Sequence, residues 1–372
     1  MNTERGQVVW ILGAGFSKSL GGLLLPELLS ERSRAETLAK FTTLSDHASR
    51  VYPLFAKHQR GNPGNRGDRG TGLPVYWEHA EEFLDFVDTA ANGNHARATV
   101  LAKELNGASL QAVRESCIRI VAAECELTSL VDISSQKTTP ESWQPYIRWV
   151  SDLNHTHSVI TFNYDVLVEK LGERGGPGSP ARNSVFGIDG CVSERERAQI
   201  YKLHGSIDWI NSTVNPEFFV QNPDPRQQIV SSDLPCIATP GPSKKLHCTT
   251  TLKNVWTRAL DTLTRAAVVV FVGYRFPPSD AESRHRLLGA LRQNQSQTGL
   301  RVHTVLGPNT GERDTIRLKE LLRSTLSETM VESTQIRETP GRGNFQVIVN
   351  PLYAEDFFEV FHPNMIFGHS MS

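Results

Sequence analysis

Four short stretches place glycine or polar residues directly after apolar runs, where they could bind a ligand or move a proton. They are Gly13-Ala14-Gly15-Phe16-Ser17, Thr161-Phe162-Asn163-Tyr164-Asp165, His204-Gly205-Ser206 and the segment from Gly273-Tyr274 to Asp280. In open α/β sheets, ligands bind beyond the carboxyl ends of the strands. We therefore expect these stretches to form one surface, although they are far apart in sequence.

The glycine turn at residues 13–17 has the composition of a phosphate-binding turn. Gly13 and Gly15 let backbone amides approach a pyrophosphate, the start of the following helix adds a positive dipole end, and Ser17 can donate a hydroxyl. The turn departs from the full dinucleotide fingerprint because Lys18 stands where the third glycine would be. A tight strand–helix turn that binds nothing explains the same residues equally well.

The second stretch places the polar side chains of Thr161, Asn163 and Asp165 where a strand ends. These groups can reach a ribose or an amide. Helix capping by Asn163 or Asp165 is the alternative.

The third and fourth stretches add a proton acceptor and a close backbone approach. Histidine has an ordinary pKa of about 6.5, so His204 can accept a proton at neutral pH, although a packed structural histidine is the alternative. Gly273 allows backbone to approach closely after a very apolar strand. A proline-fixed turn leading to a helix capped by Ser279 or Asp280 is the alternative there.

Apolar runs that alternate with amphipathic helical segments predict the fold class: an α/β protein with a doubly wound, mostly parallel Rossmann-like sheet. We expect long strands at 7–13, 157–165, 200–206, 266–273, 300–307 and 345–352, and short strands at 227–230 and 235–240.

Between these strands, an all-helical insertion is expected. Phe83, Leu84, Phe86 and Val87 share one side of a helix whose other side is acidic. The segment 58–74 is rich in glycine, proline and arginine, which predicts a mobile loop, with a phosphate or nucleic-acid contact as the alternative. The predicted domains are a sheet domain of residues 1–45 and 157–372 and an insertion of residues 46–156.

The bulk composition limits the function classes. A formal net charge of −1 argues against a dedicated nucleic-acid binder. The cysteines at 117, 125, 191, 236 and 248 form no C-x-x-C pair, so a four-thiolate zinc site is not expected. No signal peptide is evident and the run 266–273 is too short to span a bilayer, so a cytoplasmic protein without membrane contact is expected.

In their order along the chain, these motifs resemble the sirtuin-like NAD-binding family. GAG-x-S is followed by T-x-N-x-D, by HG and by a glycine turn after the last core strand. The forms TFNYD, LHGSIDW and NVWTRAL before VVVFVGYRFPPSD are similar to the bacterial sirtuin-like NADases of anti-phage defence. The resemblance covers residues 8–29 and 157–285.

The resemblance implies roles for the predicted site residues. Gly13, Ala14, Gly15, Phe16 and Ser17 would hold the dinucleotide phosphates. Asn163 and His204 would line the nicotinamide ribose as the catalytic pair, and Gly273 and Tyr274 would lie near the adenosine ribose. Thr161 and Asp165 are further cofactor-binding candidates. Asp165 would orient the ribose or stabilise positive charge on it.

The implied activity is an NAD⁺ glycohydrolase that uses NAD⁺ as substrate, needs no metal and depletes the cofactor in abortive infection. Protein deacylation is disfavoured because the paired zinc cysteines and the G-I-P-D-F-R run are missing. A module that only senses NAD⁺ or ADP-ribose is the other alternative. The resemblance also implies control by homo-oligomerisation or by a partner such as a helicase-type ATPase or an argonaute-like protein, without strong nucleic-acid binding by this chain.

Overall fold

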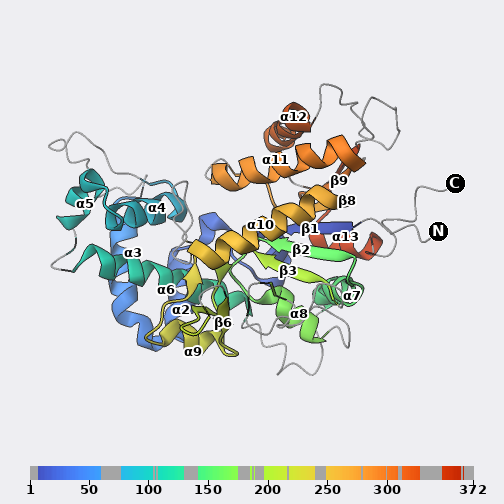
Figure 1. The fold of residues 1–372 in the computed structure, drawn as a ribbon. Coiled ribbons are helices and arrows are strands. Elements are labelled where there is room, and N and C mark those ends of the chain that lie inside the picture. The colour runs from blue at the N-terminus through green and yellow to red at the C-terminus, as the bar shows by residue number, and fades with distance from the viewer. Residues whose placement is uncertain are drawn as a thin grey trace.

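The computed structural model describes residues 7–59, 77–103, 105, 108–129, 141–174, 185–186, 188, 197–215, 218–238, 249–277, 280–298, 300–308, 312–326, 346–361 and 363. In this part of the chain, a sheet with helices on both faces lies beside a separate layer of helices (Figure 1). Apart from residues 58 and 59, the predicted loop at 58–74 lies outside the described residues.

The central sheet of the described chain has six strands in the order β10-β9-β8-β1-β2-β3, and all neighbouring pairs are parallel. The strands are β1 (Gln7–Leu12), β2 (His157–Thr161), β3 (Gln199–Lys202), β8 (Ala266–Val272), β9 (Arg301–Val305) and β10 (Gln346–Asn350). The strand order reverses at β1 and β8, and such a switch point is where doubly wound sheets bind their ligands. The predicted fold class is confirmed.

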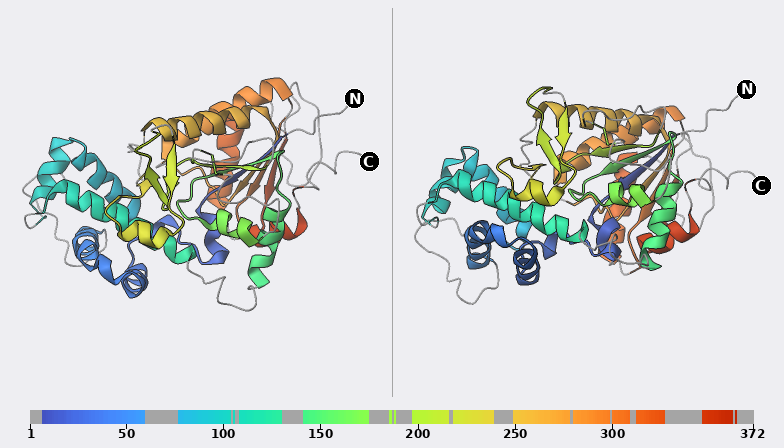
Figure 2. Two further views of the ribbon diagram at one scale, coloured as in Figure 1. Left: turned by 60° about the horizontal axis from the view of Figure 1, so that its bottom comes forward. Right: turned by 90° about the horizontal axis from the view of Figure 1, so that it is seen from below.

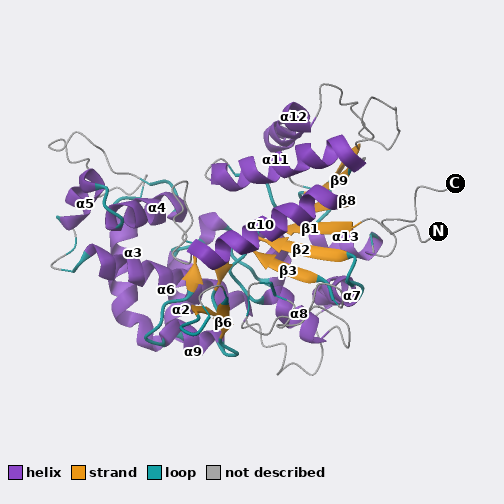
Figure 3. Cartoon of the chain, viewed as in Figure 1, coloured by secondary structure: helices purple, strands orange, loops and turns teal. Residues whose placement is uncertain are grey.

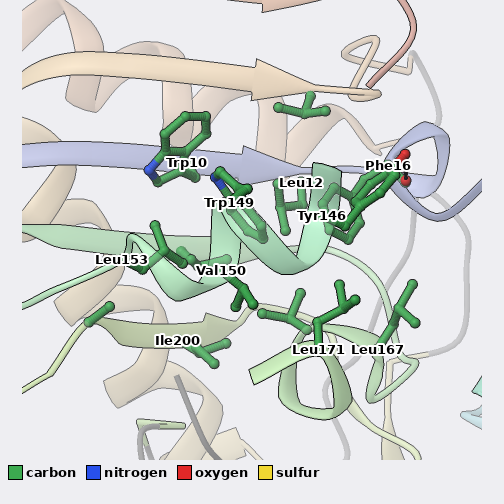
Figure 4. Packing of buried hydrophobic residues seen from close by; sticks show 14 of the residues in the cluster. Trp10, Leu12, Phe16, Tyr146, Trp149, Val150, Leu153, Leu167, Leu171 and Ile200 are labelled. Carbon is green, nitrogen blue, oxygen red and sulfur yellow. Dashed lines mark hydrogen bonds between the residues drawn. The ribbon is translucent and has the colours of Figure 1, made fainter. Parts of the chain in front are cut away.

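The alternation of side chains along β1 builds the two cores of the sheet. Trp10 and Leu12 point to the face covered by α7 (Gln144–Ser151), α8 (Leu167–Arg174) and α13 (Ala354–Val360). Figure 4 shows Trp10 packed against Trp149 from α7, with ring centroids 5.5 Å apart.

Val9 and Ile11 point to the opposite face, which is covered by three other helices. These are α10 (Thr249–Arg265), α11 (Ala281–Thr298) and α12 (Glu312–Leu326). Figure 2 shows the two sets of helices on opposite faces of the sheet. Because both faces are covered, β1 is apolar along nearly its whole length, as expected for a buried parallel strand.

The helical layer confirms the predicted all-helical insertion and contains no long strand among its described residues (Figure 3). It consists of α2 (Glu31–Lys40), α3 (Ser45–Lys57), α4 (Ala80–Ala91), α5 (His95–Ala102) and α6 (Leu110–Ser129). Its core also includes Leu28 and Phe41, which precede residue 46, and Ile207 and Ile229, which follow residue 156. The domain boundaries themselves stay a prediction.

Short elements complete the chain around the sheet. They are α1 (Ala14–Ser17), η1 (Lys18–Leu20), η2 (Leu25–Glu27), η3 (Thr42–Leu44), η4 (Glu141–Trp143), β4 (Gly205–Ser206), β5 (Trp209–Asn211), β6 (Phe219–Gln221), α9 (Pro225–Val230) and β7 (Cys236–Ile237). The short strand predicted at 227–230 is wrong, because this segment lies in α9. The Asp224 carboxylate accepts the amides of Arg226 and Gln227, and Pro225 occupies the first helical turn.

Glu124 is a fully buried carboxylate in α6 that fixes the segment leading into α2. It accepts the amide of Leu29 at 3.0 Å and the hydroxyl of Tyr52 at 2.7 Å. Leu29 has a φ of 57°, a backbone conformation that residues other than glycine rarely adopt. Burial raises the pKa of Glu124 to about 7 from an ordinary value of 4.5, although these hydrogen bonds lower it.

Replacing Glu124 with glutamine is expected to reduce the dependence of stability on pH. Because the folded state binds the Glu124 proton more tightly, this group stabilises the fold fully below pH 4.5 and loses that contribution as the pH rises through 7. The whole change amounts to about 3–4 kcal/mol, of which about 2–3 kcal/mol falls between pH 5 and pH 8. Urea denaturation at pH 5 and pH 8, which span most of this range, measures the effect. The free energy of unfolding should fall less between these two pH values in Glu124→Gln than in the wild type. The exposed Glu36→Gln should behave like the wild type.

No helix in the described residues is both long enough and apolar enough to cross a membrane.

Candidate active site

The turn after β1 and the turn after β8 meet in direct backbone contact at the switch point. The amide of Gly13 donates to Val272 O at 3.0 Å, and the amide of Gly15 donates to Gly273 O at 3.2 Å. A Cβ on Gly273 would lie 2.3 Å from the nitrogen of Phe16. The two turns can therefore approach only because glycine stands at these positions, and they form one continuous surface.

This contact changes what the residues of the glycine turn can do. The amides of Gly13, Gly15 and Phe16 already donate to backbone carbonyls, whereas Ala14 N–H has no hydrogen-bond partner among the described residues. The Ser17 hydroxyl donates inward to Ala14 O at 3.2 Å, and the Phe16 ring is packed in the core beside Tyr146 and Trp149 (Figure 4). Helix α1 has only four residues, so its dipole is weaker than expected for a long helix. Ala14 is thus the residue of this turn best placed to meet a phosphate.

Gly273→Ala is expected to damage the fold and the site together. The residue has a φ of 65°, and an added Cβ would overlap the backbone of the Gly15–Phe16 turn. The left-handed conformation alone costs about 1–2 kcal/mol with a side chain, and the overlap adds to it. Thermal unfolding should show a clear fall in Tm. Gly289→Ala is the matched control, since a Cβ in that helix meets no atom within 4 Å and should stabilise it. Equal Tm values for the two variants would contradict the close contact.

Asn163 joins the turn after β2 to the turn after β1. Its side-chain Nδ2 donates to Gly13 O at 3.2 Å, and its backbone amide donates to the hydroxyl of Thr161 at 3.1 Å. Asn163 is half-buried, whereas Thr161 is buried. The structure therefore brings Asn163 to the switch point, with the Thr161 side chain supporting its backbone.

Asp165 caps the helix that follows. Its carboxylate accepts the amide of Leu167 at 3.1 Å at the start of α8. Burial raises the pKa of Asp165, and the nearby Lys202 ammonium partly offsets this effect. The capping alternative is thus realised for this side chain, and a role toward a ribose stays a prediction.

A buried network holds the chain that carries His204. The Lys202 ammonium, which is fully buried, donates to Glu169 at 2.9 Å and to the carbonyl oxygen of Asp165. Burial disfavours the charge on Lys202, but the carboxylates of Glu169 and Asp208 outweigh it and raise the pKa of Lys202. From the other side, Trp256 Nε1 donates to Leu203 O at 2.9 Å. The position of His204 is therefore fixed by the residues immediately before it.

The chain turns sharply after His204. Gly205 has a φ of 78°, and a Cβ there would lie 1.9 Å from Cys236 O on the facing strand β7. Beyond the turn, the hydroxyl of Ser206 donates to the carboxylate of Asp208 at 2.5 Å. Glycine at position 205 therefore allows the main chain to turn directly after His204.

His204 lies in a buried aromatic and acidic environment. Its side chain packs on Phe162, with ring centroids 5.0 Å apart, and its ring centroid lies 6.1 Å from that of Tyr164. Nε2 of His204 lies 3.6 Å from a carboxylate oxygen of Asp280, and both side chains are at least nine-tenths buried. Sequence reasoning considered Asp280 only as a helix cap. Its position at the end of the fourth stretch, after a strand of the same sheet, could have indicated that it lies near His204.

Tyr274 places its side chain on this same side. Its ring stacks on Phe162, with centroids 4.4 Å apart and an angle of 12° between the planes. The hydroxyl is buried without a hydrogen-bond partner among the described residues. Burial, together with the negative charge of Asp280, raises the pKa of Tyr274. The Tyr274 ring thus lies on Phe162, which also contacts His204. Its proximity to an adenosine ribose stays a prediction.

The described residues contain no group of three or more His, Cys, Asp or Glu side chains arranged to hold a metal ion.

Residues 157–326 match the family model of the SIR2-like domain. The match includes Asn163, His204, Gly273 and Tyr274 but not the glycine turn at 13–17. Among solved structures, the chain is similar to a crystal structure of Sir2 in complex with the inhibitor EX-527, 2′-O-acetyl-ADP-ribose and a deacetylated p53 peptide. This likeness has 13% sequence identity and a TM-score of 0.33, and it covers 97% of this chain and 94% of that one. A search of curated proteins found no match.

Proposed function

We propose that this chain is an NAD⁺ glycohydrolase that cleaves NAD⁺ to nicotinamide and ADP-ribose. The observation that carries the proposal is that one sheet edge, at the switch point, holds the glycine turns, Asn163 and His204. The match of residues 157–326 to the SIR2-like domain supports an NAD-related function for that edge.

The residues fit the needs of this reaction. The Ala14 amide would meet the phosphates where the turns after β1 and β8 touch. The Asn163 side chain, held beside Gly13 O, would bind the carboxamide, a ribose hydroxyl or the attacking water. The Asp165 carboxylate, which caps α8, is the remaining candidate to stabilise positive charge on the ribose.

The hydrolytic step balances with water as the only co-reactant. The water oxygen forms a bond to C1′ of the nicotinamide ribose, while the bond from C1′ to the pyridinium nitrogen breaks. The electron pair of that bond stays with the ring and gives neutral nicotinamide. His204 accepts the proton lost by the water, and general-base catalysis of this kind contributes about 10²–10⁴-fold to a rate.

The biological setting is proposed from the family resemblance. It implies that NAD⁺ depletion serves anti-phage defence in the bacterial cytoplasm. An unrestrained NADase would kill its host, so we propose control by oligomerisation of this chain or by a separate partner protein. Arg97 of the helical layer pairs with the buried Asp85 but keeps 35% of its own side chain exposed, so it would be available to such a contact.

The test is nicotinamide and ADP-ribose production from NAD⁺ by the purified full-length chain, over a range of protein concentrations. Release without any acyl-lysine peptide, lost in Asn163→Ala, is the expected result. A rise in specific activity with protein concentration would support control by oligomerisation. Release only when an acetylated peptide is present would instead identify a deacylase, and binding without release would identify a sensor.

A further inference from the structure

His204 contacts the carboxylate of Asp280 through one particular ring nitrogen. The distance from Nε2 to the Asp280 oxygen is 3.6 Å, and the side chains are only 7% and 5% exposed. This is ion-pair distance, a few tenths of an ångström beyond a hydrogen bond. Hydrogen bonds in catalytic groups are commonly long in ligand-free proteins and shorten when the substrate binds.

The chemistry of the two groups determines where the imidazole proton lies. An ionised carboxylate can only accept hydrogen bonds, so the nitrogen that faces it must carry the hydrogen. In neutral His204, this leaves the lone pair on Nδ1. The nitrogen that faces the carboxylate thus decides which nitrogen is left to accept a proton.

The negative charge of Asp280 also acts on Tyr274. The Tyr274 hydroxyl is buried without a partner among the described residues, and the charge of Asp280 acts on it strongly enough to help raise the pKa of Tyr274. Phe162 stacks on Tyr274 and also packs against His204, so one aromatic side chain contacts both rings.

The main chain of His204 is held by a separate set of hydrogen bonds. The Tyr164 hydroxyl donates to Ala238 O, so it is directed to the backbone of the strand end beyond β7. The Ala238 amide in turn donates to His204 O at 2.8 Å. These bonds fix the backbone of His204, whereas Asp280 contacts its ring.

We propose that Asp280 is a positioning residue that holds His204 as the Nε2–H tautomer and leaves Nδ1 to accept the proton. The use of Nδ1 rests on the proposed function, whereas the tautomer itself does not. When Nδ1 takes up a proton, the resulting imidazolium lies beside a carboxylate that stabilises it.

The tautomer can be measured without turnover. Two-bond ¹H–¹⁵N correlation spectra of full-length protein with ¹⁵N-labelled histidine distinguish the two neutral tautomers, and the His204 signals are those missing in His204→Ala. At a pH where the ring is neutral, the wild type should show Nε2–H, and Asp280→Asn should mix the tautomers. An Nδ1–H ring in the wild type, or an unchanged pattern in Asp280→Asn, would overturn the inference. If Asp280→Asn does not fold, the wild-type spectrum alone decides.

Kinetics give the second readout. Asp280→Asn is expected to lower kcat for nicotinamide release about 10²-fold and to change KM less than about threefold, since the carboxylate acts through His204 and does not touch the substrate. Glu282→Gln is the matched control, because this carboxylate is exposed on the same helix and pairs with Arg286. Equal rates for the wild type and Asp280→Asn would contradict the role. An Asp280-dependent tautomer in a protein with no turnover would refute the proposed function and leave the pairing intact.

Discussion

His204→Ala is expected to lower the rate of nicotinamide release about 10²–10⁴-fold, because it removes the group that accepts a proton from the attacking water. The imidazole is buried beside Phe162 and Asp280 at the edge where the glycine turns meet. Its loss should reduce kcat more than it weakens NAD⁺ binding. Initial rates measured over a range of NAD⁺ concentrations separate these two effects.

His285→Ala is the matched control for that experiment. His285 is exposed on α11, five residues after Asp280, and the site needs nothing from it. It should release nicotinamide at the wild-type rate. Loss of activity in both variants would point to a general effect of histidine removal, and full activity in His204→Ala would remove His204 from the mechanism.

Lys202→Ala is expected to lower the free energy of unfolding by about 3–5 kcal/mol, the largest stability effect that we predict. Removing one member of a buried ion pair leaves the other charge without compensation. Lys202 Nζ lies 2.9 Å from the Glu169 carboxylate and near that of Asp208. Its removal leaves both carboxylates in the protein interior without a cation. Denaturant unfolding, followed by far-UV circular dichroism, measures this change.

Two further variants separate this effect from an ordinary loss of charge. The pair of Arg265 and Asp261 lies on the surface of α10, so Arg265→Ala should cost less than about 1 kcal/mol. The double variant Lys202→Met with Glu169→Leu should recover much of the stability, since apolar residues often replace a buried pair without loss. A loss below about 1 kcal/mol in Lys202→Ala would show that Lys202 does not hold the His204 segment.

The strands of the sheet were predictable because a buried parallel strand is a nearly continuous apolar run. The segment 266–273 illustrates this, because it contains four valines and no polar side chain, as is typical of a strand buried on both faces. The edge of the sheet was predictable for the same reason, since each motif directly follows such a run. Asn163 and His204 were thereby expected beyond the carboxyl ends of their strands. The structure places the Asn163 side chain against Gly13 O and the His204 ring against Phe162, and their roles toward NAD⁺ stay a prediction.

What escaped prediction depends on contacts between distant residues. Gln227 to Val230 have strand-like composition, but the Asp224 cap and Pro225 start a helix there. The rings of Tyr274 and His204 both pack on Phe162, a pairing that sequence spacing does not reveal. Asp280 likewise has the local signature of a helix cap, and only the fold shows that it also faces an imidazole.

The most direct test of the central claim is hydrogen exchange with and without an NAD⁺ analogue whose ribose–nicotinamide bond cannot be hydrolysed. If the four strand ends form one NAD⁺ site, the analogue should slow amide exchange in residues 13–17, 161–165, 203–206 and 273–277 together. Exchange in α5 and α6, which lie in the helical layer, should stay unchanged and serves as the internal reference. Unchanged exchange in all four segments, or protection confined to the helical layer, would contradict an NAD⁺ site at this edge of the sheet.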